Sequence, residues 1–135
     1  MNKKIFMIID DDADDRFAFT SALKEMLSST ECMEAESCEE ALRKLREGEQ
    51  LPHFIFLDVN LPRMNGYGCL KELKSDDKLR GIPVIMYSTS FTEQSIKEFR
   101  TLGALSYLHK PTDLSKLPDA IIEAIKRPLK VNYYK

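Results

Sequence analysis

The residues most able to do chemistry in this sequence are acidic, and they follow short apolar runs. Asp10 and Asp11 come directly after the run at 5–9, and Asp58 follows the run at 54–57. A carboxylate at the end of a buried strand costs free energy unless a cation or a hydrogen-bond donor compensates it. Carboxylate oxygens also suit Mg²⁺, which takes only one or two carboxylates from a protein and keeps several waters. We therefore expect these aspartates to share a cation-dependent role.

A hydroxyl and an ammonium follow two further apolar runs. Ser88 comes directly after the run at 82–87, and Lys110 comes soon after the run at 105–108. Ser88 supplies a hydrogen-bond donor and Lys110 a compact positive charge. A carboxylate can act as a nucleophile, and cations can neutralise the oxygens of a phosphoryl group that it attacks. The combination is typical of a site that accepts a phosphoryl group.

The apolar runs alternate with stretches of helical spacing, and a weaker apolar run lies near 33–35. Helical spacing is found at 19–26, 41–45, 70–73, 96–102 and 114–125. Ser37 and Glu40 form a capping-box pattern before the second helix, which Gly48 is expected to end. Thr92 is expected to cap the fourth helix, which should end at Gly103. Pro128 is expected to end the fifth.

Near-continuous apolar strands that alternate with helices predict an α/β domain. We expect a doubly wound, five-stranded parallel sheet with five helices. In such sheets ligands bind beyond the carboxyl ends of the strands. The aspartates, the serine and the lysine named above are all expected at that edge.

Length and composition exclude several classes of protein. The chain has 135 residues, enough for one domain, and 43% hydrophobic residues, enough for a core. Its 20 basic and 22 acidic residues give a net charge of −2, which argues against a nucleic-acid partner. The apolar run at 5–9 is too short for a secretory or membrane segment. We expect a cytoplasmic protein without a membrane partner, whose three cysteines (Cys32, Cys38 and Cys69) are reduced and structural.

Four stretches of the sequence carry a resemblance to a known family. They are residues 7–12, 56–66, 83–88 and 103–111. The second contains the pattern Leu-Asp-x-x-x-Pro-x-Met-x-Gly, which begins at Leu57 and ends at Gly66. With these motifs in this order, the chain resembles the receiver domain of two-component response regulators over residues 3–127. The resemblance implies the flavodoxin-like receiver fold.

The resemblance also implies a set of ligands around Asp58, which would be the phosphoacceptor. Asp11, Asp58 and the backbone carbonyl of Asn60 would hold Mg²⁺, with Asp10 assisting through water. No other cofactor is implied. The phosphoryl donor would be a phosphohistidine on a sensor histidine kinase or a histidine phosphotransfer protein.

The remaining implied roles concern the response to phosphorylation. Lys110 would contact the phosphoryl oxygens, Ser88 would move to donate a hydrogen bond to them, and Tyr107 would turn inward with Ser88. The peptide bond between Lys110 and Pro111 is expected to be cis. A downstream protein target would dock on the fourth helix, the fifth strand and the fifth helix.

We expect a single-domain response regulator rather than an enzyme, because it would promote only its own phosphorylation and dephosphorylation. Residues 128–135 are expected to form a short C-terminal tail with no output domain. The protein is expected to be a monomer or a weak homodimer.

Four other functions use similar residues. A phosphatase of the haloacid dehalogenase type needs a small or β-branched residue where this chain has Asp14, and a flavin phosphate would be repelled by the aspartates at 10–15. A calcium-binding EF-hand fails because its glycine and glutamate positions hold Asp15 and Ser21. The alternatives are a phosphate-independent, receiver-like interaction module and, behind it, an aspartyl-phosphate phosphatase. The other three acidic residues, Asp12, Asp14 and Asp15, are interpreted as helix cap and surface.

Overall fold

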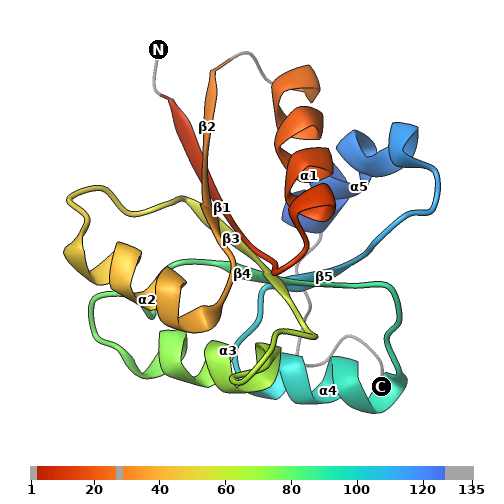
Figure 1. Ribbon diagram of the computed structural model, residues 1–135. Helices are drawn as coiled ribbons and strands as arrows, with labels where there is room; N and C mark the ends of the chain where they lie inside the picture. Colours follow the sequence, from red (N-terminus) through yellow and green to blue (C-terminus); the bar gives the residue numbers. More distant parts are fainter. Residues whose placement is uncertain (1–2, 27–28, 127–135) are drawn as a thin grey trace.

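The computed structural model describes residues 3–26 and 29–126. Its sheet has five strands: β1 (Lys4–Ile9), β2 (Thr30–Ala35), β3 (Phe54–Asp58), β4 (Val84–Ser88) and β5 (Ser106–His109). All neighbouring strands pair in parallel, in the order β2-β1-β3-β4-β5 (Figure 1). The predicted doubly wound fold is confirmed. The predicted tail at 128–135 and the helix end at Pro128 lie outside the described residues.

Five helices cover the two faces of this sheet. They are α1 (Ala13–Met26), α2 (Cys38–Glu47), α3 (Gly66–Ser75), α4 (Glu93–Thr101) and α5 (Leu117–Lys126), and a 3-10 turn, Leu114–Lys116, precedes the last. Helices α1 and α5 pack on one face, and α2, α3 and α4 on the other (Figure 1). None of the described helices is long and apolar enough to cross a membrane.

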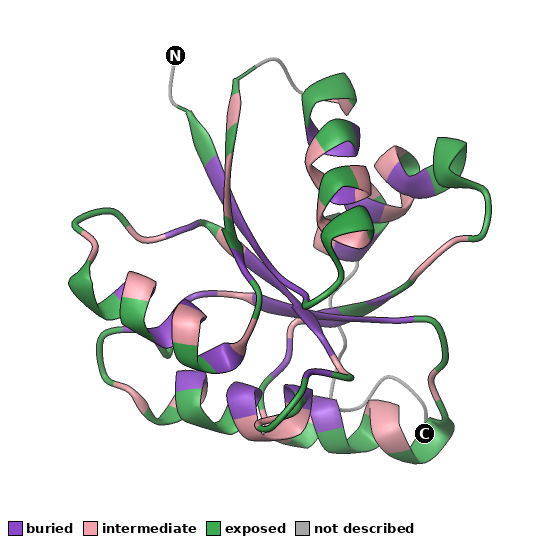
Figure 2. Cartoon of the chain, viewed as in Figure 1, coloured by how far each residue is buried: buried purple, intermediate pink, exposed green. Residues whose placement is uncertain are grey.

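Burial explains why the central strands have clear apolar patterns in the sequence and the edge strands have weak ones. Alternate residues of β1 face opposite layers, with Met7 packing toward α2–α4 and Ile8 toward α1 and α5. All of β4 is buried, so its sequence is continuously apolar (Figure 2). Strands β2 and β5 lie at the edges of the sheet. In β5 buried and exposed residues alternate, and in β2 only Ala35 is buried, which makes the apolar patterns of both strands weaker.

The helix starts follow the predicted caps. The Ser37 hydroxyl accepts a hydrogen bond from the Glu40 N–H at 3.1 Å, while the Glu40 carboxylate accepts one from Glu36 rather than from Ser37. The cap of α4 is reciprocal: Thr92 accepts from the Ser95 N–H, and Ser95 accepts from the Thr92 N–H. These side chains satisfy N–H groups that the first turn of a helix leaves without partners.

The last predicted helix is partly wrong. Leu114 lies in the 3-10 turn with 59% of its surface exposed, so it does not share the buried face of Leu117 and Ile121. The Asp113 side chain accepts a hydrogen bond from Ser115 and opens this turn ahead of α5. Gly103, with a φ of 101°, lies just beyond α4 as expected.

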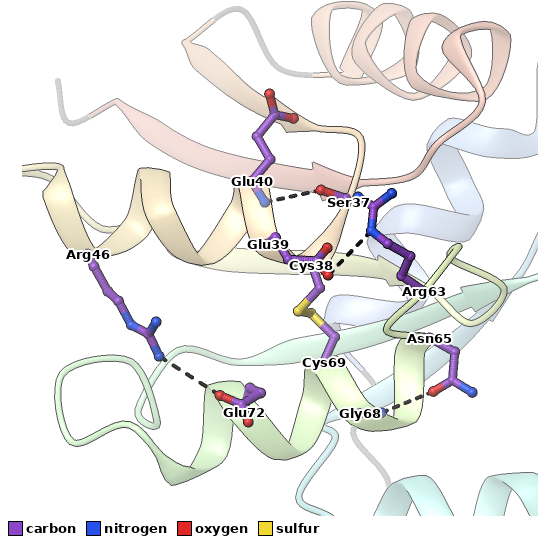
Figure 3. The surroundings of a disulfide bond; sticks show 10 residues. All are labelled: Ser37, Cys38, Glu39, Glu40, Arg46, Arg63, Asn65, Gly68, Cys69 and Glu72. Carbon is purple, nitrogen blue, oxygen red and sulfur yellow. Dashed lines mark hydrogen bonds and ion pairs between the residues drawn. A yellow bond between two sulfur atoms is a disulfide. The ribbon is translucent and has the colours of Figure 1, made fainter.

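Two of the cysteines expected to be reduced are joined by a disulfide. Cys38 begins α2 and Cys69 lies in the first turn of α3, with their Cα atoms 5.7 Å apart (Figure 3). Both are completely buried, and the pair of helices is bridged further by an ion pair from Arg46 to Asp76. The pairing depends on how α2 packs against α3, which cysteine spacing does not reveal. Cys32 is free, and burial raises the pKa of its thiol to about 12.

The start of α3 rests directly on the backbone that follows β3. The Gly66 N–H donates to the Val59 carbonyl at 2.9 Å. A Cβ atom at Gly66 would lie 2.7 Å from the Val59 Cα and 2.8 Å from the Asp58 carbonyl oxygen. Because both neighbours are backbone atoms, they cannot move aside as a flexible side chain would. The glycine of the Leu-Asp-x-x-x-Pro-x-Met-x-Gly pattern therefore has a steric reason to be there.

Reducing the disulfide is expected to lower the free energy of unfolding by about 3–4 kcal/mol, because the bond joins residues 31 positions apart and restricts the unfolded chain. Urea unfolding with and without dithiothreitol measures this difference. The Cys32→Ser variant is the control and should show the same loss on reduction. Equal unfolding midpoints, with all three cysteines open to alkylation in the unfolded and untreated protein, would contradict the disulfide.

Replacing Gly66 by alanine is expected to cost about 1–3 kcal/mol of stability, because the added methyl group meets backbone atoms. The matched control is Gly81→Ala, where nothing lies within 4 Å of the new Cβ. That control should change stability by no more than about 0.5 kcal/mol. Urea unfolding of both variants compares them, and equal losses would show that the close approach at Gly66 has no energetic effect.

Candidate functional site

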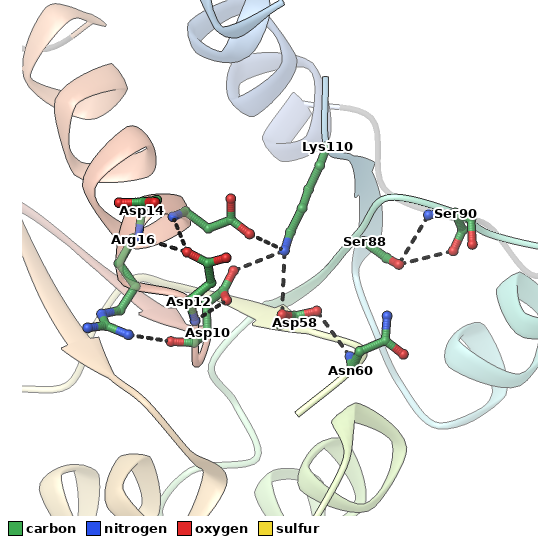
Figure 4. Close-up of polar contacts among 10 residues, drawn as sticks. Asp10, Asp12, Asp14, Arg16, Asp58, Asn60, Ser88, Ser90 and Lys110 are labelled. Carbon is green, nitrogen blue, oxygen red and sulfur yellow. Dashed lines mark hydrogen bonds and ion pairs between the residues drawn. The ribbon is translucent and has the colours of Figure 1, made fainter. Parts of the chain in front are cut away.

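The carboxyl edge of the sheet gathers charged side chains from three strands. Asp10 follows β1, Asp58 is the last residue of β3, and Lys110 follows β5 (Figure 4). The Lys110 Nζ lies 3.0 Å from the Asp10 Oδ2 and 3.4 Å from the Asp58 Oδ2. The backbone N–H of Lys110 donates to the Ser88 carbonyl at 2.7 Å, which extends the pairing of β4 and β5 to this residue. The structure thus brings together residues that are about 50 and 100 positions apart in the chain.

Each buried carboxylate is held in the same way. One oxygen of Asp10 accepts a hydrogen bond from the Asp12 N–H at 2.9 Å, and one oxygen of Asp58 accepts from the Asn60 N–H at 3.0 Å. In both cases the donor is two residues further on, in a local turn that aspartate favours. The other oxygen of each carboxylate faces Lys110. These turns fix the orientation of both carboxylates before any ligand arrives.

Burial and charge oppose each other at this site. Burial, together with repulsion from Asp58, raises the pKa of Asp10 to about 6, against the lowering effects of the Asp12 N–H and of Lys110. Burial also disfavours the charge of Lys110, but its hydrogen bond with Asp15 and the charges of Asp10 and Asp58 outweigh this and raise its pKa above the ordinary value. Lys110 is therefore a permanent cation at neutral pH.

The donor atoms of three acidic residues suit a cation. Asp10, Asp11 and Asp58 each offer a carboxylate oxygen, and these oxygens lie within 4.8 Å of one another. Three carboxylates against the single ammonium of Lys110 leave an excess of negative charge, which a divalent cation would offset. Hard oxygen donors of this kind fit Mg²⁺. Asp11 is exposed to solvent, so an entering ion can reach it.

Two residues expected at the site lie near it without joining the cluster. Ser88 ends β4 and is buried, but its hydroxyl donates to the Ser90 carbonyl at 3.0 Å and accepts from the Ser90 N–H at 3.2 Å (Figure 4). Tyr107 on β5 is 38% exposed, and its ring centroid lies 4.9 Å from that of Phe91. In the structure, therefore, the Ser88 hydroxyl is bound within its own loop, and the Tyr107 ring is outward.

No cis peptide bond occurs among the described residues, so the bond between Lys110 and Pro111 is trans. The expectation of a cis bond is therefore wrong for this structure. A trans bond before proline is the intrinsically favoured form. Lys110 reaches its carboxylate partners from this trans backbone, so its contacts do not require the rarer isomer.

Three residues of the site were missed from the sequence. The Asp15 Oδ2 lies 2.9 Å from the Lys110 Nζ, so its interpretation as cap and surface is wrong. Arg16 donates to the Asp10 carbonyl at 2.8 Å and pairs with a carboxylate of β2. The Tyr87 ring lies 4.8 Å from the Lys110 Nζ and attracts the cation through its π face. One signal could have found two of them. A helix that begins directly after Asp12 turns Asp15 and Arg16 toward the strand ends.

Asp12 does have the expected capping role. Its side chain accepts hydrogen bonds from the N–H groups of Asp14 and Asp15, at 2.8 Å and 3.2 Å. The Asp12 carboxylate is thus engaged at the start of α1. It belongs to the helix cap and is separate from the cluster around Lys110.

Two known proteins are similar to this chain in sequence over most of its length. The sensory transduction protein LytT of Bacillus subtilis is 33% identical over 126 residues, which cover 93% of this chain and 48% of that protein. The sensor histidine kinase CheAY of Helicobacter pylori is 27% identical over 122 residues, covering 90% of this chain and 15% of the kinase. The chain thus spans about half of the length of the first relative and much less of the length of the second.

Solved structures match over nearly the whole chain. The phosphorylated cyanobacterial phytochrome response regulator RcpA has a TM-score of 0.80 and 33% identity, covering 90% of this chain and 92% of that one. The Mn²⁺-bound form of the response regulator Rcp1 has a TM-score of 0.78 and 26% identity, covering 98% and 97%. The family model for the response regulator receiver domain matches residues 6–122. With its strand-end carboxylates and lysine in place, this chain belongs to the response regulator receiver domain family.

Proposed function

We propose that this protein accepts a phosphoryl group on Asp58 from a phosphohistidine donor, in a reaction that depends on Mg²⁺. The observation that carries the proposal is the position of the Asp58 carboxylate, 3.4 Å from the Lys110 ammonium and within 4.8 Å of the oxygens of Asp10 and Asp11. A nucleophile beside an ammonium and a set of cation ligands suits attack on the phosphorus of a negatively charged phosphoryl group.

The proposed step forms one bond and breaks one. An oxygen of Asp58 attacks the phosphorus of the phosphohistidine, the P–O bond forms, and the P–N bond breaks with its electron pair passing to the imidazole. Lys110 neutralises charge on the phosphoryl oxygens, and the Asn60 N–H holds the Asp58 carboxylate in place during attack. Asp10, Asp11, Asp58 and the Asn60 carbonyl would hold Mg²⁺, which supplies further positive charge to the phosphoryl oxygens.

The donor would be a sensor histidine kinase or a histidine phosphotransfer protein in the cytoplasm. One relative of this chain is itself named a sensor histidine kinase, which supports a donor of this class. A disulfide is uncommon in a reducing cytoplasm. Both cysteines of the pair are completely buried, and limited access slows attack by external thiols. The proposed chemistry is restricted to the protein's own phosphorylation and dephosphorylation.

The response would pass to the surface formed by α4, β5 and α5. After phosphorylation Ser88 would exchange its two bonds with Ser90 for a bond to the phosphoryl group. The same loop continues to Phe91, whose ring packs against Tyr107 on β5 and, 6.0 Å away, against Phe99 on α4. Movement of this loop would therefore change the surface that a downstream protein target contacts.

A phosphatase of the haloacid dehalogenase type is disfavoured by one observation. Such an enzyme has an Asp-x-Asp-x-(Thr/Val) run after its first strand, which here would use the carboxylates of Asp10 and Asp12 together. Asp12 instead accepts two backbone hydrogen bonds at the start of α1. The phosphate-independent interaction module remains the second candidate and is an outcome of the experiment below.

Wild-type protein is expected to gain one phosphoryl group when incubated with acetyl phosphate and Mg²⁺, because that reagent supplies an activated phosphoryl group to the Asp58 carboxylate. Intact-mass spectrometry measures the gain, and both Asp58→Asn and an excess of EDTA should abolish it. A gain in Asp58→Asn equal to that in wild type would contradict Asp58 as the phosphoacceptor. Failure of wild type to react, with either acetyl phosphate or a phosphorylated histidine kinase, would favour the phosphate-independent module.

A further inference from the structure

Among the described carboxylate partners of Lys110, Asp15 alone comes from a helix rather than from a strand end. It lies in the first turn of α1, and its Oδ2 is 2.9 Å from the Lys110 Nζ, closer than either Asp10 at 3.0 Å or Asp58 at 3.4 Å. Its neighbour Asp14 points away and is exposed (Figure 4). Of these two adjacent aspartates in α1, only Asp15 has a described contact with the site.

The three carboxylates account for all the hydrogen-bonding capacity of Lys110. An ammonium has three N–H donors and no acceptor. With Asp10, Asp15 and Asp58 each within hydrogen-bonding distance, none of those donors is left for an incoming phosphoryl oxygen. A phosphoryl group on Asp58 can gain a bond from Lys110 only by taking one from an existing partner.

Of the two partners other than Asp58 itself, burial indicates which gives up its bond more easily. The Asp10 side chain is completely buried, so losing Lys110 would leave an unpaired charge away from water, at high cost. The Asp15 side chain is 40% exposed, so water can replace the ammonium. The exchange therefore costs less at Asp15 than at Asp10.

We propose that Asp15 is a positioning residue, which holds the Lys110 ammonium in the unphosphorylated protein and competes for it with the phosphoryl group on Asp58. This inference rests on the proposed function, because the competitor is the phosphorylated or phosphoryl-mimicking state of Asp58. Asp15 thereby opposes the switch and sets how strongly phosphorylation must attract Lys110.

The first test is the affinity for beryllofluoride, an anion that mimics a phosphoryl group on a carboxylate, in the presence of Mg²⁺. Asp15→Asn is expected to bind it about twofold to fivefold more tightly than Asp14→Asn, the range that a half-exposed ion pair allows. NMR titration of backbone amides measures both constants. Asp14→Asn removes the same charge from the same helix turn, so the comparison isolates the contact with Lys110.

Two further variants test whether the effect passes through Lys110. Asp15→Glu keeps the charge on a slightly longer side chain and should retain the affinity of wild type. In a Lys110→Ala background, Asp15→Asn and Asp14→Asn should have equal effects, since no ammonium remains to be released. A difference that persists without Lys110 would overturn the positioning role and assign the effect to Asp15 itself.

A second measurement needs no phosphoryl group. The proton–nitrogen NMR signal of the Lys110 ammonium, recorded in EDTA, should be sharp in wild type and Asp14→Asn and broadened in Asp15→Asn, because a held ammonium exchanges slowly with water. An unchanged signal in Asp15→Asn would overturn the holding role. If wild type binds no beryllofluoride, the proposed function and the competition fail together. If wild type binds it and Asp15→Asn equals Asp14→Asn, only the competition fails.

Discussion

Lys110 is the only cation within hydrogen-bonding distance of the buried carboxylates of Asp10 and Asp58 in the part of the chain that the structure describes. The α/β fold places these carboxylates together, because parallel strands end at one edge of the sheet. Such an arrangement is unfavourable unless positive charge accompanies it. Lys110 supplies that charge from β5, with its ammonium also over the ring of Tyr87. The site therefore depends on one ion-pair network that joins the first, third and fifth strands.

The surrounding backbone keeps this network in one geometry. Local turns at Asp12 and Asn60 orient the two buried carboxylates, and Arg16 ties the Asp10 carbonyl to the edge strand β2. Gly66 lets α3 approach the backbone of β3 at the point where Asp58 is placed. These contacts are made before any cation or phosphoryl group binds, so little of the site has to be ordered during the proposed reaction.

The sequence was sufficient for the parts of the structure that depend on local pattern. Continuous apolar runs predicted the central strands, and the residues that follow them, Asp10, Asp58 and Lys110, were predicted to meet because parallel strand ends meet. The edge strands β2 and β5 were less clear, since only one residue of β2 is buried and β5 alternates between buried and exposed residues. The motifs further predicted the family, which the family model confirms.

The features missed from the sequence depend on how elements pack. Cys38 and Cys69 are brought together by two helices on the same face of the sheet, and their spacing in the chain carries no sign of this. Asp15 belongs to an acidic stretch in which its neighbours Asp12 and Asp14 only cap α1 or face solvent, and the direction in which α1 starts selects it. Ser88 was placed correctly on its strand, but its bonds with Ser90 follow from the loop geometry.

The central claim is that Lys110 compensates buried carboxylates, and the free energy of unfolding tests it most directly. At pH 8 in EDTA, Lys110→Ala should lose about 3–5 kcal/mol, the cost of removing one partner from a buried ion pair. Adding Asp10→Asn to that variant should restore a large part of the loss, because the unpaired buried charge is then gone. A loss below about 1 kcal/mol, as for an exposed ion pair, with no recovery in the double variant, would contradict the account.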